Sequence, residues 1–162
     1  MTKTKAARRR LIGRVREHPS SYTAFRVTYV ESSALVRALL DHDSAVASAL
    51  DAPGRHVTSA VTFAEAQRAL VRARVAGQIS AKAEAALSDH LESRSARFEI
   101  LAVTDGVLTR AGRPFPVEPV RTLDAIHLAT LELLGEPPQL VRVVTRDERV
   151  AANARALGYA VV

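Results

Sequence analysis

Four acidic residues that are far apart in the chain fall where strands end or where the following helices begin. Glu31 closes an apolar, β-rich stretch, and Asp147 directly follows another. Glu65 lies in the first turn of a helix after a strand, and Asp124 opens a helix after a proline-rich loop. Because ligands of an open parallel sheet collect at the carboxyl ends of its strands, we expect these four carboxylates to converge on one edge.

Converging carboxylates raise one another's pKa unless a cation lies among them. Oxygen ligands without cysteine suit a hard ion such as Mg²⁺ or Mn²⁺, and the chain contains no cysteine. Such an ion activates water and stabilises charge on an attacked phosphate. The pattern therefore predicts metal-assisted phosphodiester hydrolysis, with the metal ligands also serving as the catalytic residues: Glu31, Glu65, Asp124 and Asp147.

Two of these acids also fit helix-capping roles. Thr62 and Glu65 have the spacing of a capping box, and Glu65 could instead pair with Arg68 one turn further along. Asp147 could be the N-cap of its helix. Arg68 and Arg72, one and two turns beyond Glu65, are candidate phosphate contacts or simply solvated charges of a helix.

Structural roles are also open for the other two acids. Asp124 begins a helix that is apolar nearly all round, so it needs a strong partner, and the helix N-terminus supplies part of that stabilisation. Glu31 could be an ordinary surface acid at a strand end. His127, three residues after Asp124, could bind a metal, but a core histidine bonded to a backbone carbonyl is the simpler interpretation.

The elements that must position these residues alternate along the chain. Strands are expected over 27–31, 56–59, 98–103, 140–145 and 159–162. Helices are expected over 33–40, 44–50, 62–77, 81–93, 123–134 and 147–157, with a short one from Thr104. Strands alternating with helices indicate an α/β fold in which a mostly parallel sheet lies between helical layers.

Charge divides the 162 residues into two parts. The formal net charge is +6, which by itself suggests a polyanionic partner. Residues 1–26 hold eight Lys/Arg against one acid, a net +7, whereas residues 27–162 hold 15 against 16, a net −1. We therefore expect one domain over 27–162 preceded by a basic extension, which could be an unstructured nucleic-acid-binding arm, a basic helix or a segment without function.

Composition also excludes several classes of protein. No apolar run is long enough for a membrane-spanning helix, and the extension lacks the apolar stretch of a secretory signal. Without cysteine there is no disulfide framework or thiolate zinc site, which fits a cytoplasmic protein. The chain has no glycine-rich turn after its first strand, which argues against a nucleotide-binding or phosphosignal-binding doubly wound domain.

Four stretches of the chain resemble a known family, the PIN-domain proteins of the VapC toxin type. The most specific are Leu123–Thr130, reading LDAIHLAT, and residues 144–158, which begin VTRDER. The stretches 27–36 and 62–65 resemble the family's opening strand and helix and the segment that carries its second acid.

The resemblance implies a PIN-like three-layer α/β/α fold and a Mg²⁺- or Mn²⁺-dependent ribonuclease that acts on RNA. It also implies a toxin that is often a homodimer and that is held inactive by a cognate antitoxin protein. The ligands it assigns are Glu31, Glu65, Asp124 and Asp147, with Ser33 and Thr145 as supporting hydroxyls, although Ser33 could also be a helix N-cap.

Glu31 departs from the family pattern, in which the first acid is usually aspartate. The added methylene moves the carboxylate outward, and a displacement of about 1 Å can cost roughly 100-fold in rate. This leaves a second hypothesis open, a catalytically weakened PIN-like module that acts by binding RNA or a partner.

Overall fold

The sheet is built on valine-rich strands that are covered on both faces. The computed structural model describes residues 25–162, and in this part of the chain five parallel strands lie in the order β3-β2-β1-β4-β5. Every residue of the central strand β1 is buried, as expected for a parallel strand between helical layers. The strands are β1 (Val27–Val30), β2 (Arg55–Ser59), β3 (Glu99–Leu101), β4 (Val141–Val144) and β5 (Ala160–Val161).

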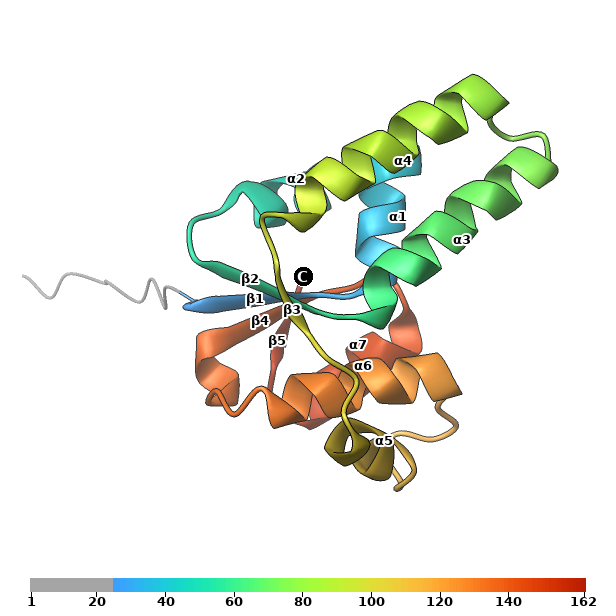
Figure 1. Ribbon diagram of the computed structural model, residues 1–162. Coiled ribbons are helices and arrows are strands. Elements are labelled where there is room, and N and C mark those ends of the chain that lie inside the picture. Colours follow the sequence, from blue (N-terminus) through green and yellow to red (C-terminus); the bar gives the residue numbers. More distant parts are fainter. Residues whose placement is uncertain (1–24) are drawn as a thin grey trace, which may run out of the picture.

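Two layers of helices enclose this sheet (Figure 1). Helices α1 (Ser32–Leu40), α2 (Ser44–Asp51), α3 (Val61–Val75) and α4 (Ala81–Ser95) pack on one face around Val30 and Val144. Helices α6 (Thr122–Leu133) and α7 (Glu148–Ala156) pack on the other face around Tyr29 and Val143, with α5 (Asp105–Ala111) outside α6. The short 3-10 helix η1 (Pro138–Leu140) precedes β4. The predicted three-layer α/β/α fold is confirmed.

The first helix begins differently from the prediction. Its N-cap is Glu31, whose side chain accepts a hydrogen bond from the backbone N–H of Ser33, so the prediction that Ser33 is the cap is wrong. The strand ends at Val30, and this places residue 31 rather than residue 33 at the boundary where the first backbone donors need partners.

The capping box predicted for α3 is also absent. The helix starts at Val61 without a side-chain cap, and Oγ1 of Thr62 instead accepts a hydrogen bond from Thr58 at 2.7 Å. This leaves the carboxylate of Glu65 available for contacts outside its own helix.

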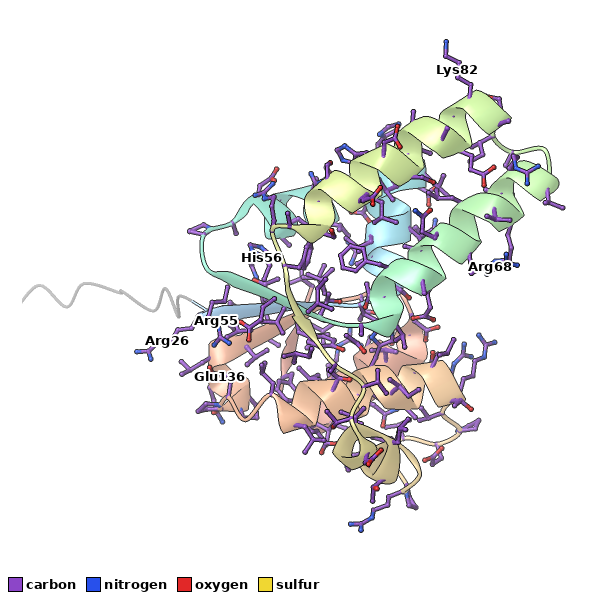
Figure 2. The ribbon with its side chains drawn as sticks, viewed as in Figure 1. Arg26, Arg55, His56, Arg68, Lys82 and Glu136 are labelled. Carbon is purple, nitrogen blue, oxygen red and sulfur yellow. The ribbon has the colours of Figure 1, made fainter. Side chains whose placement is uncertain are left out.

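The two ends of the sheet differ in character. At the amino ends of the strands, Arg55 forms ion pairs with Glu99 at 2.9 Å and Glu136 at 2.7 Å, and Figure 2 shows Arg55 and Glu136 close together there. The predicted acids gather at the carboxyl ends. Within residues 25–162, no helix has the length and apolar character needed to cross a membrane. The predicted basic extension lies, except for its last two residues, outside the described residues.

Candidate active site

The pairing of β1 with β4 brings Glu31 to the end of β4. Val30 of β1 pairs with Val144 of β4, so the residues that follow them, Glu31 and Thr145, are neighbours although 114 positions separate them. The backbone N–H of Glu31 donates to the Val144 carbonyl at 3.0 Å, which extends the strand pairing to the edge of the site.

Glu31 is buried and held by hydroxyl donors. Only 4% of the residue is exposed. Its Oε2 accepts from the Thr145 hydroxyl at 2.8 Å, from the Ser33 N–H at 3.0 Å and from the Ser33 hydroxyl. Its Oε1 accepts from the Ser32 hydroxyl at 2.7 Å. These bonds fix the longer glutamate side chain, and because each oxygen has two lone pairs, only Oε1 retains capacity for another partner.

The supporting hydroxyls also tie the two strand ends together. Oγ of Ser33 accepts the backbone N–H of Arg146 at 2.7 Å, and Oγ1 of Thr145 accepts the backbone N–H of Asp147 at 3.1 Å. The two hydroxyl oxygens are 3.3 Å apart. Through them the carboxylate of Glu31 is linked to the loop that carries Asp147.

Glu65 meets a buried histidine from the opposite helical layer. Nε2 of His127 lies 2.7 Å from Oε2 of Glu65 and 3.9 Å from Oε1 of Glu31. His127 is 1% exposed, so it is a core histidine as expected, but its side-chain partner is a carboxylate rather than the predicted backbone carbonyl. The alternative pairing of Glu65 with Arg68 does not occur among the described residues.

The other ring nitrogen of His127 faces Tyr29. The Tyr29 hydroxyl donates to the His127 backbone carbonyl at 3.1 Å and lies 3.2 Å from Nδ1. Burial, followed by the charge of Glu31, raises the pKa of Tyr29, so the phenol stays protonated as a donor. Together, Glu31, Glu65 and His127 offer three potential metal-ligand atoms within 4.8 Å of one another.

Asp124 and Asp147 are bridged by an arginine that the sequence pattern did not indicate. Nε of Arg149 lies 3.2 Å from Oδ2 of Asp124, and Nη2 lies 3.3 Å from Oδ2 of Asp147. Burial and the nearby charge of Asp147 raise the pKa of Asp124, and Arg149 acts in the opposite direction. Asp147 is also the N-cap of α7, accepting from the backbone N–H of Arg149 and Val150, so its predicted capping role is confirmed.

All four predicted acids line one open cleft of about 350 Å³. The cleft lies where β1 and β4 end, between α1 and α3 on one side and α6 and α7 on the other. Basic side chains stand among the acids in its wall: Arg37, Arg72, Arg121 and Arg146. The convergence expected from the strand-end rule is therefore present in the structure.

Arg68 lies outside this cleft, in an adjoining groove of about 410 Å³ that it shares with Glu65 and Arg72. Figure 2 shows Arg68 projecting outward from α3. Arg72 lines both the groove and the cleft, so it connects the two surfaces.

A parallel sheet with a carboxylate-lined cleft at the carboxyl ends of its strands agrees with the comparisons to known proteins. The model of the PIN domain family matches residues 28–156. The chain belongs to the PIN-domain family. Ribonuclease VapC46 of Mycobacterium tuberculosis is 38% identical to this PIN protein over 136 residues, which are 83% of the chain and 95% of the relative. The resemblance to the VapC type is confirmed.

Solved structures share the fold of this PIN domain at low identity. Mycobacterium tuberculosis VapC20, described as a Sarcin-Ricin loop cleaving toxin, has a TM-score of 0.58 and 16% identity, covering 82% of this chain and 95% of its own. A chain of Rickettsia felis VapBC2, solved with a DNA fragment from its promoter, has a TM-score of 0.58 and 11% identity, covering 84% and 97%.

The donor atoms of this PIN site fit a divalent cation. Within residues 25–162, no hydrogen bond reaches Oε1 of Glu65, and Oε1 of Glu31 keeps one lone pair. Carboxylate oxygens are the ligands that Mg²⁺ and Mn²⁺ prefer. The described residues thus contain an acidic cluster able to hold such an ion.

Proposed function

We propose that this protein is a divalent-metal-dependent endoribonuclease, the toxin component of a type II toxin–antitoxin system. The observation that carries the proposal is the convergence of Glu31, Glu65, Asp124 and Asp147 on one open cleft. The relatives support the reaction class, because VapC46 is named a ribonuclease and VapC20 a toxin.

In this proposal the four carboxylates hold one or two Mg²⁺ or Mn²⁺ ions. When bound, the ion supplies an activated water and stabilises negative charge on the phosphate. The chain's own task is to hold the carboxylates in place. Ser33 and Thr145 fix Glu31 from α1 and from the end of β4, and His127 fixes Glu65 from α6.

Three arginines at the cleft and its neighbouring groove are the proposed phosphate contacts. Arg68, Arg72 and Arg121 are exposed, and none forms an ion pair with another residue of the described range. Arg37 and Arg146, by contrast, are engaged by Asp41 and Asp43. Removing one phosphate-binding charge lowers the slope of log K against log salt by about 0.7 for single strands, and we expect a decrease of about that size for RNA binding by Arg72→Gln.

The direct test is cleavage of a structured RNA by purified protein with Mg²⁺ or Mn²⁺. We expect cleavage with either ion, none in EDTA, and a loss of at least 100-fold in Asp124→Asn. Asp89→Asn is the matched control, because Asp89 is an exposed carboxylate on α4 outside the cleft. Cleavage that persists in EDTA or in Asp124→Asn would overturn the metal mechanism.

The second candidate function is a catalytically weakened PIN-like module that binds RNA or a partner. Glutamate at position 31, where the family usually has aspartate, favours it. The variant Glu31→Asp separates the two proposals. Cleavage by Glu31→Asp but not by the natural chain would favour the binding module, whereas full activity with Glu31 in place would remove it.

The proposal also includes a partner, an oligomer and a location. The VapBC2 neighbour supports a cognate antitoxin as the protein partner. We propose a homodimer and a cytoplasmic location as well, supported by the family resemblance and the proposed RNA substrate. Sedimentation of the purified chain at several concentrations tests the dimer, and a mass that stays monomeric throughout would contradict it.

A further inference from the structure

Arg149 places a positive charge of the chain itself between the carboxylates of Asp124 and Asp147. Its guanidinium contacts Asp124 through Nε and Asp147 through Nη2, at 3.2 and 3.3 Å. Asp124 lies in the first turn of α6 and Asp147 is the N-cap of α7, and their side chains are only 14% and 24% exposed. Two carboxylates this close repel each other unless positive charge lies between them.

We infer that Arg149 is the resident counter-cation of the Asp124–Asp147 pair and competes with the divalent metal for these two carboxylates. The inference rests on the proposed function, in which both aspartates are metal ligands. A guanidinium hydrogen-bonded to both occupies oxygen lone pairs that a metal ion would use, and its charge repels a second cation.

The position of Arg149 allows it to leave without a change of fold. It lies in the first turn of α7, only two residues after Asp147, and its side chain is 39% exposed. Its backbone N–H donates to Oδ1 of Asp147 at 2.8 Å, and this capping bond does not depend on the side chain. Rotation of the side chain toward solvent therefore frees both aspartates while the helix cap stays in place.

Two opposite effects distinguish a competing cation from a merely structural ion pair. Replacing Arg149 leaves the aspartates without compensation in the metal-free protein, so its melting temperature falls. The same replacement removes both the competitor and a positive charge in contact with the two carboxylates, so metal affinity rises. A unit charge a few ångströms from a divalent ion, even at the dielectric constant of water, changes affinity by about tenfold.

The experiment is calorimetric titration of the full chain with Mn²⁺, combined with thermal melting in EDTA, for Arg149→Gln and Arg149→Lys. We expect Arg149→Gln to bind Mn²⁺ about tenfold more tightly and to melt at a lower temperature without metal. Lysine keeps the charge but not the contact with both aspartates. We therefore expect the Mn²⁺ affinity and the melting temperature of Arg149→Lys to lie between those of the natural chain and those of Arg149→Gln. Arg155→Gln is the control, because within residues 25–162 Arg155 pairs only with the exposed Glu148 on the same helix.

The outcomes separate this inference from the proposed function. If the natural chain binds Mn²⁺ and Arg149→Gln binds it with equal or lower affinity, the counter-cation inference is wrong and the metal mechanism stands. If none of these proteins binds Mn²⁺ or Mg²⁺, both are wrong. Tighter binding without a lower melting temperature would also contradict the inference, since an uncompensated carboxylate pair must destabilise the metal-free fold.

Discussion

The contact between His127 and Glu65 yields the sharpest prediction about how the site is held. His127 is 1% exposed and presents Nε2 to Glu65 at 2.7 Å. Asparagine at this position reaches about as far as Nδ1, whereas the amide nitrogen of glutamine reaches about as far as Nε2. We therefore expect His127→Asn to lose the contact with Glu65 and His127→Gln to keep much of it.

The size of the effect follows from the kind of bond. A hydrogen bond to a charged group contributes about 1.5–3 kcal/mol, and water reaches the 23% exposed Glu65 side chain, so the lower end applies. The Asn variant is expected to melt about 5 °C lower. Glu65 without its partner is free to move by about 1 Å, which predicts a fall of roughly 100-fold in kcat for RNA cleavage.

The assay compares kcat, KM and melting temperature for the two variants. A positioning role for His127 predicts that kcat falls in His127→Asn with little change in KM. It also predicts that the kcat of His127→Gln is at least tenfold higher than that of His127→Asn. Equal kcat values for the two variants, or full activity in His127→Asn, would refute the reasoning, because the histidine would then be only a packing residue.

Three further predictions concern other parts of the molecule. Thr145→Val removes a donor to Glu31 and should lower the free energy of unfolding in urea by about 1–3 kcal/mol. An unchanged midpoint of urea unfolding would contradict the role of Thr145 in holding that carboxylate. Arg146 and the cap of α2 lower the pKa of Asp43 from 3.8 to about 2, so its stabilisation is present above pH 3.8 and is lost as pH falls toward 2. Asp43→Asn should flatten the acid unfolding curve in that window, and an unaltered curve would argue against this linkage. Removing residues 1–24 deletes seven Lys/Arg and should reduce the salt dependence of RNA binding, whereas an unchanged slope would mean that this segment takes no part.

The sequence was sufficient to predict the fold and the meeting of the four acids. Valine-rich strands alternating with amphipathic helices leave few arrangements, and the strand-end rule then places Glu31 and Asp147 at the same edge of the sheet. The prediction of Ser33 as the cap failed because serine is a common cap residue, while the actual boundary depends on where β1 stops.

The side-chain pairs across layers could not be predicted in the same way. The bond between His127 and Glu65 depends on the rotation of α6 relative to α3, and the sheet separates their helical layers. Arg149 was missed for a similar reason, since a charged residue in a first helical turn is usually solvated. Its contact with Asp124 arises only when α6 and α7 pack together.

The most direct test of the central claim is the location of bound metal in a crystal of the protein grown with Mn²⁺. Anomalous scattering from manganese identifies the ion without reference to activity. The proposed metal site predicts anomalous density inside the cleft, between the carboxylates of Glu31, Glu65, Asp124 and Asp147. Manganese bound elsewhere, with none in the cleft at saturating concentration, would contradict it.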